Sequence, residues 1–146
     1  MDWSGHVFDA GDVEYVLVAN TCALYSVILF GRAITDVDSF LHDLRVELQE
    51  SFVKAGLGPL AKRKLVPNVT AVVFAKSANR SSIASINNLI QSARRLLLGH
   101  ELSPRDAAVR LNTRPLKTLG YLFPVEALSK MAQGRWQNER DDAETP

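Results

Sequence analysis

Hydrophobic and polar positions follow two different periods along the chain, and the change of period locates the elements. Residues 14–19 and 23–30 are rich in β-branched and aromatic side chains, and Asn20 with Thr21 between them can turn the chain. This pattern predicts an N-terminal β-hairpin. Because both runs are almost continuously apolar, we expect the strands to be buried on both faces. A similar run at residues 69–75 predicts a third strand.

Helical spacing begins after the hairpin. Thr35 and Asp38 have the spacing of a capping box, and Gly56 stands where a helix C-terminus is expected. Between these signals apolar side chains recur every three or four positions, which predicts an amphipathic helix. Its apolar face comprises Val37, Phe40, Leu41, Leu44, Leu48 and Phe52.

A second helix follows the third strand. Ser81 or Ser82 is its expected N-cap, and Gly99 is its expected end. Its apolar stripe is wide, so we expect the helix to pack deeply. The stripe comprises Ile83, Ile86, Leu89, Ile90, Ala93, Leu96 and Leu97.

Two short helices complete the pattern. Ser103 and Pro104 give the first of them a cap and a proline at its first position, and the helix stops before Pro115. The second begins at Pro124 and ends near residue 133. Neither is long enough to carry a core of its own.

These elements predict an α+β fold with the order β-β-α-β-α-α-α. A hairpin and a third strand form a small sheet, which two longer and two short helices cover. The 146 residues are 47% hydrophobic, which suffices for one packed core. We therefore expect a single globular domain over residues 1–134 and a frayed polar tail over residues 135–146.

Charge is distributed unevenly along the chain. Residues 1–53 carry nine acids and two bases, a net charge of −7, whereas residues 54–117 carry twelve bases and two acids, a net charge of +10. Residues 118–146 carry five acids and three bases, a net charge of −2. The basic block indicates an acidic partner such as nucleic acid. Alternatively, the acidic first third folds against the basic middle and neutralises it.

Cysteine content and hydropathy limit the location of the protein. The single cysteine, Cys22, permits no internal disulfide and no cysteine metal cluster. No apolar run approaches the roughly 18–20 residues that span a bilayer. The first residues lack the basic and apolar regions of a secretion signal. These features favour a cytoplasmic protein without membrane contact.

The junction between the third strand and the second long helix is the first candidate for chemistry. It places two cations and three hydroxyls at a helix N-terminus, where unpaired N–H groups favour an anion. The candidate anion-binding residues are Lys76, Ser77, Arg80, Ser81 and Ser82. The junction lacks the glycines of a Walker loop or a dinucleotide fingerprint. In the alternative interpretation the serines only cap the helix, and Arg80 pairs with an acid of the first helix.

Further basic and polar residues extend this candidate site. Asn87 and Arg94 have helical spacing, and with Arg95 they form a possible groove along the second long helix. Asn87 and Arg94 are equally consistent with buried polar groups that fix the helix to its neighbours. Lys62, Arg63 and Lys64 form a basic patch in a loop.

The segment from residue 111 to residue 128 resembles locally the tail of acidic-triad transposases. Such enzymes hold two metal ions with three carboxylates. The predicted strands offer no suitably placed aspartate, and residues 54–100 contain no acid. A structural connector explains the same segment, with Pro115, Gly120 and Pro124 as its stop, turn and start.

Other catalytic chemistry has little support. The three histidines lie in different elements without the spacing of metal ligands, and no Gly-x-Ser-x-Gly motif is present. We therefore expect no catalytic residues, no metal and no cofactor.

The motifs together resemble a bacterial family of domains of unknown function. The resemblance lies in an Ala-Lys-Thr/Ser strand end, an Asn/Ser-Arg-Ser step, a Ser-Met/Ile-Asn helix and a Leu-Asn/Ala-x-x-Pro segment before a Pro-started helix. The matching positions are Ala75-Lys76-Ser77, Asn79-Arg80-Ser81, Ser85-Ile86-Asn87, Leu111, Asn112, Pro115 and Pro124. The chain departs from the family at Ile86, where many relatives have methionine, and at Asn88, where they have aspartate. The second departure removes an acid from the candidate site. The resemblance implies the fold and the junction, and no reaction.

Three functional hypotheses follow. In the first, the protein is a non-enzymatic binding protein whose basic middle third engages nucleic acid or another acidic partner. In the second, it is the partner protein of a toxin–antitoxin or defence operon, and an acidic protein covers its basic surface. In the third, it is a small enzyme that acts on a phosphorylated substrate through Lys76, Arg80 and a nearby serine.

Overall fold

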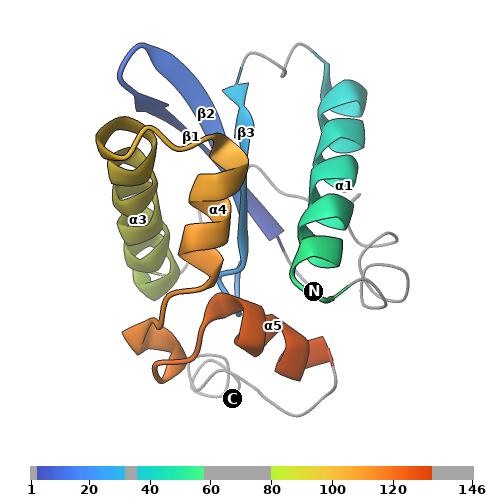
Figure 1. Ribbon diagram of the computed structural model, residues 1–146, viewed down its shortest axis with the longest axis vertical. Coiled ribbons are helices and arrows are strands. Elements are labelled where there is room, and N and C mark those ends of the chain that lie inside the picture. The colour runs from blue at the N-terminus through green and yellow to red at the C-terminus, as the bar shows by residue number, and fades with distance from the viewer. Residues whose placement is uncertain (1–2, 32–35, 58–79, 133–146) are drawn as a thin grey trace.

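A computed structural model describes residues 3–31, 36–57 and 80–132, and for residues 80–83 it describes the backbone only. The described strands are β1 (Trp3–Ala10), β2 (Val13–Asn20) and β3 (Ser26–Phe30), which form one antiparallel sheet in the order β1-β2-β3 (Figure 1). The described helices are α1 (Val37–Lys54), α3 (Arg80–Arg94), α4 (Pro104–Asn112) and α5 (Pro124–Ala132). The α+β class is therefore confirmed. The expected strand at residues 69–75, the basic loop before it and the polar tail lie outside the described residues.

The central strand β2 is buried on both faces, as its composition predicts. Val16 and Leu17 are adjacent, so their side chains point to opposite faces of the sheet, and both are fully buried. The predicted hairpin is the β2–β3 pair, in which Leu17 lies opposite Ile28. The strand β1 was not predicted and pairs with β2 on its other side.

The loop between β2 and β3 is closed by Asn20 and is longer than predicted, because residues 23–25 belong to it and β3 starts at Ser26. Its side-chain oxygen accepts hydrogen bonds from the backbone N–H groups of Cys22 (3.0 Å) and Ala23 (2.7 Å). The backbone N–H of Leu24, a residue with φ of 59°, donates to the Asn20 carbonyl at 2.9 Å. One asparagine thus satisfies three N–H groups of a buried turn.

Helix α1 has the predicted end, and its predicted apolar face is buried at Phe40, Leu44, Leu48 and Phe52. Val37, which the prediction placed on this face, is 63% exposed because it lies at the first position of the helix. The helix also has a cap that differs from the prediction. Its N-cap is Asp36 in place of Thr35, and the Asp36 carboxylate accepts from the Asp38 N–H at 3.2 Å. An aspartate one residue later serves equally well because its carboxylate reaches the N2 position and suits the positive end of the helix dipole. At the other end Gly56 adopts φ of 78°, and the N–H of Leu57 donates to the Phe52 carbonyl at 2.6 Å. This pattern is a Schellman motif, which explains the glycine.

Helix α3 begins at Arg80, so Ser81 and Ser82 lie in its first turn and neither is the cap. It continues into η4 (Arg95–Gly99), a π-helical turn, and ends at Gly99 as predicted. The apolar stripe of α3 and η4 is buried at Ile86, Leu89, Ile90, Ala93 and Leu97. In Figure 1, α3 and α4 lie on one side of β3, and α1 lies on the other.

The last two helices begin at their predicted prolines. The Ser103 hydroxyl accepts from the Asp106 N–H at 3.1 Å, which confirms the predicted cap of α4. Gly120 then turns the chain with φ of 63°, and Pro124 starts α5. None of the described helices combines the length and the apolar character needed to cross a bilayer.

Candidate functional site

The structure describes only part of the predicted anion seat. Lys62, Arg63, Lys64, Lys76 and Ser77 lie outside the described residues. The backbone of Arg80, Ser81 and Ser82 forms the start of α3. The anion seat and the basic loop therefore stay predictions.

The predicted groove residues are exposed on α3. Asn87, Arg94 and Arg95 are all exposed, so none is a buried polar group. Arg94 nevertheless connects α3 to the sheet, because its Nε donates to the Asp9 carbonyl of β1 at 2.8 Å. Its guanidinium carbon lies 5.9 Å from the centre of the Phe8 ring, within the range of a cation–π contact. Arg94 thus fixes one end of α3 while remaining open to solvent.

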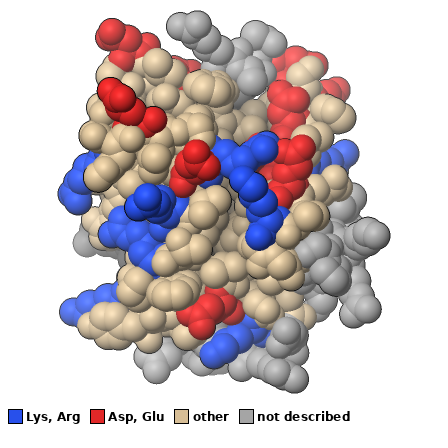
Figure 2. Space-filling model, in the orientation of Figure 1, with Lys and Arg blue, Asp and Glu red and all other residues tan. Residues whose placement is uncertain are grey.

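Basic side chains gather around α3 and α4. Figure 2 shows Lys and Arg on the left of the view, over these helices and below them, and in the centre between α4 and α1. Asp and Glu gather over α1 and near the β1–β2 turn, and smaller acidic groups lie over the start of α4 and over α5. We call the exposed cations of this region the basic face; its members are Arg94, Arg95, Arg110, Arg114 and Lys117. Among the described residues, both ion pairs involve Arg105, and no member of the basic face takes part in one.

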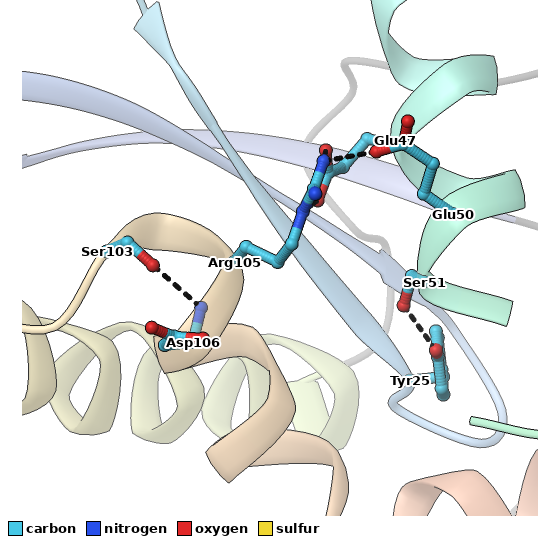
Figure 3. Close-up of polar contacts among 7 residues, drawn as sticks. All are labelled: Tyr25, Glu47, Glu50, Ser51, Ser103, Arg105 and Asp106. Atoms are coloured by element: carbon cyan, nitrogen blue, oxygen red, sulfur yellow. Dashed lines mark hydrogen bonds and ion pairs between the residues drawn. The ribbon is translucent and has the colours of Figure 1, made fainter. Parts of the chain in front are cut away.

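Arg105 is the point where the acidic first third meets the basic middle. It extends from α4 to α1 (Figure 3), where its Nε and one terminal nitrogen donate to the two Glu47 oxygens at 3.1 and 2.9 Å. The same guanidinium also pairs with Glu50. The bonds from Glu47, together with its charge, raise the pKa of Arg105 above its ordinary value. Neutralisation of the middle by the first third is thus local in the described ranges: it occurs at the α1–α4 contact.

The segment after α4 forms a tight turn with an exposed aromatic tip. The turn contains η5 (Lys117–Leu119), and the Tyr121 N–H donates to the Leu116 carbonyl at 2.9 Å. Tyr121 has φ of 67°, a left-handed conformation that is unusual for a bulky residue, and is 67% exposed. Phe123, two residues later, is also exposed. The turn therefore holds a strained aromatic side chain in solvent next to the basic face.

A cleft lies where α1, α4, α5 and the start of β3 meet. It encloses about 350 Å³. Helix α4 contributes one wall and the C-terminal end of α1 the other. The lining residues are Tyr25, Ser51, Lys54, Ala55, Asp106, Val109, Asn112, Thr113 and Val125.

Tyr25 and Ser51 place a hydroxyl pair in this cleft. Their oxygens are 2.5 Å apart and face each other in Figure 3. The Tyr25 ring is 1% exposed and packs edge-on against Phe52, with ring centres 5.2 Å apart. Burial raises the pKa of Tyr25, and the bond to Ser51 only partly opposes it. The phenol therefore stays protonated at neutral pH and acts as a hydrogen-bonding group, not as a nucleophile.

Asn112 holds the wall of the cleft in place. Its side-chain oxygen accepts from the Ser26 N–H at 2.8 Å, and its side-chain nitrogen donates to the Ser26 carbonyl at 2.9 Å. The amide thus imitates a neighbouring strand at the start of β3. Sequence reasoning noted the Leu111-Asn112 motif without this role, and it did not identify the cleft, because its walls come from segments far apart in the chain.

In the part of the chain that the structure describes, no group of three or more His, Cys, Asp or Glu side chains is arranged to hold a metal ion.

Comparisons with known proteins add one relationship. A family model described as a domain of unknown function, DUF6933, matches residues 1–127. Comparison with curated proteins and comparison with solved structures each found no match.

Proposed function

The chain belongs to the DUF6933 family, and we propose that this member binds nucleic acid through its basic face and, in addition, through the predicted basic residues before it. The observation that carries this proposal is the unbalanced charge of the middle third. Residues 80–117 hold seven bases and two acids, a net charge of +5. Cations that are exposed and not engaged in ion pairs are available to phosphate groups.

The position of the acids supports the same conclusion. Helix α1 carries carboxylates that face α4, yet Glu47 and Glu50 engage Arg105 alone in the described ranges. The basic face keeps its charge as a result.

The exposed aromatic residue favours nucleic acid over an acidic protein as the partner. Tyr121 follows Lys117 in the turn, and aromatic rings beside cations are the combination on which unpaired bases stack. Stacking contributes about 1–3 kcal/mol per base in such sites. We therefore propose single-stranded nucleic acid as the preferred form, in the cytosol, with phosphate contacts from the basic face and one base on Tyr121.

Fluorescence anisotropy with a labelled single-stranded oligonucleotide tests this function. We expect affinity to fall steeply between low and physiological salt, as the release of counterions requires. The double variant Arg110→Gln/Arg114→Gln should weaken binding and reduce the dependence on salt. The control Lys54→Gln/Lys130→Gln removes the same charge outside the basic face and should leave binding nearly unchanged.

Two outcomes contradict the proposal. One is no binding at low salt. The other is equal weakening by both double variants, since that would indicate a response to net charge alone. Co-purification with the product of a neighbouring gene that persists at high salt favours instead the partner protein of a toxin–antitoxin or defence operon.

A further inference from the structure

The cleft between α1, α4 and α5 is separate from the basic face and needs its own explanation. We infer that it binds a small carboxylate with an apolar body, and a branched-chain amino acid is the smallest probe that carries the required groups. A volume of about 350 Å³ lies at the lower end of the roughly 300–1,000 Å³ of small-molecule sites. The inference rests on which polar groups of the lining are already engaged and which are available.

Two polar side chains of the lining are already bonded within the fold. The Asn112 amide is bonded at both ends to the Ser26 backbone. The Thr113 hydroxyl donates to the Val109 carbonyl at 2.8 Å, within its own helix. These groups shape the wall, and the hydrogens that form these bonds are not available to a ligand.

The available groups are donors on the α1 side of the cleft. Lys54 ends α1, and none of the ion pairs among the described residues includes it. Tyr25 and Ser51 share one hydrogen bond, which uses one of their two hydroxyl hydrogens. The other hydroxyl hydrogen remains for an acceptor. A cation and a hydroxyl donor together suit a carboxylate, because hydrogen bonds to charged groups are the strong ones.

The rest of the lining is apolar. Val109 and Val125 come from α4 and α5, and Ala55 follows α1. They would cover a short aliphatic chain attached to the carboxylate. Burying such a chain contributes roughly 25 cal/mol per Å² of apolar surface, so the body of the ligand supplies affinity while Lys54 fixes its orientation.

Asp106 adds a second charge to the lining and sharpens the choice of ligand. Its carboxylate takes part in no ion pair within the described ranges. A second acid group on the ligand would meet repulsion there, whereas an ammonium group would find a partner. Among small carboxylates, an apolar α-amino acid therefore fits both charges, whereas the second carboxylate of a dicarboxylate is repelled by Asp106.

Isothermal titration calorimetry of the full chain with a matched set of compounds tests the inference. The set is L-leucine, isocaproate, which lacks the amino group, isoamylamine, which lacks the carboxylate, and succinate. We expect leucine and isocaproate to bind, with leucine tighter, and isoamylamine and succinate not to bind. Lys54→Met should weaken both binders about tenfold, the loss of one charge-assisted hydrogen bond. Asp106→Asn should remove only the advantage of leucine.

Controls separate a ligand effect from a folding effect. Lys130→Met removes an exposed lysine that does not line the cleft, and it should leave leucine binding unchanged. Val109→Trp fills the cleft from a partly exposed position and should abolish binding while the thermal melting curve stays cooperative. The inference is overturned if neither acid binds, if isoamylamine binds as well as leucine, or if Lys54→Met and Lys130→Met behave alike.

Discussion

Asn112 and Tyr121 belong to one short segment, yet their surroundings are opposite. Asn112 is 4% exposed, and both the oxygen and the nitrogen of its amide bond to the Ser26 backbone. Tyr121 is 67% exposed and holds a backbone conformation that costs a residue with a side chain about 1–2 kcal/mol. The fold explains why the Asn112 side chain is buried and bonded, whereas for Tyr121 it explains the backbone turn but not the exposed ring.

This difference separates an architectural position from a proposed binding position in the segment. A buried polar group with satisfied bonds stabilises the arrangement of α4 on β3. A strained and exposed aromatic residue persists only where the surrounding structure imposes it, and such residues cluster at binding sites. Pro115 separates the two regions, because α4 ends before it and the turn begins after it. We therefore assign the first region to architecture and the second to the basic face.

The largest expected effect comes from removing the architectural contact. Asn112→Ala leaves the buried N–H and carbonyl of Ser26 without partners, and each unsatisfied group costs about 1–3 kcal/mol. We expect the free energy of unfolding to fall by about 2–4 kcal/mol, measured by urea denaturation. Asn87→Ala, an exposed asparagine on α3, is the matched control and should change it by less than about 0.5 kcal/mol. Similar losses in the free energy of unfolding for both variants would contradict the architectural role of Asn112.

The next variant is expected to raise the free energy of unfolding, whereas the first lowers it. Tyr121→Gly relieves the left-handed strain but adds freedom to the unfolded chain, so we expect a net gain of about 0.5–1 kcal/mol in the free energy of unfolding. The same variant should lose affinity for single-stranded nucleic acid. A protein that becomes more stable as it binds less would show that the strain serves binding.

Two further variants separate the ring from the backbone at this position. Tyr121→Ala keeps the strain and removes the ring, so it should lose binding without gaining stability. Tyr121→Phe keeps both and should resemble the original protein in anisotropy and in urea denaturation. If Tyr121→Ala retained full affinity, the proposed stacking of a base on Tyr121 would be wrong. The proposed phosphate contacts of the basic face would remain to be tested by the arginine variants.

The helices could be predicted from the sequence because their boundaries are set by neighbouring residues. The residues that set these boundaries act on the backbone within one helical turn. The structure places a helix start at Ser103 with Pro104 and at Pro124, and a helix end at Gly56. The strand β1 escaped prediction because Ser4 and Gly5 interrupt its apolar pattern. It forms by pairing with β2, which supplies hydrogen bonds that no local pattern encodes.

The two candidate sites differ in the same respect: the basic face follows from local sequence, and the cleft depends on long-range packing. The exposed arginines of the basic face could be counted from the sequence, since charge needs no fold to be recognised. The cleft could not be predicted, because Tyr25, Ser51 and Val125 come together only when β3, α1 and α5 pack. The Tyr25–Ser51 contact joins residues that the sequence assigns to two separate apolar runs. Long-range packing thus creates the cleft between α1, α4 and α5, which no sequence motif marks.

The last expected effect is no larger than that of Tyr121→Gly at low salt and becomes smaller at high salt. It concerns the ion pairs of Arg105. Arg105 fixes α4 to α1 through Glu47 and Glu50, as Asn112 fixes α4 to β3, but its side chain is 43% exposed. Exposed ion pairs contribute about 0.2–1 kcal/mol because water screens them, although two-point contact with one carboxylate favours the upper end. We expect Arg105→Met to lower the free energy of unfolding by about 0.5–1 kcal/mol at low salt and by less at high salt. Arg110→Met, which breaks no described ion pair, should leave it unchanged at both. Arg105→Met and Asn112→Ala could instead lower the free energy of unfolding equally. Exposure would then not explain the difference between the two contacts, and the contrast between buried and exposed residues would rest on geometry alone.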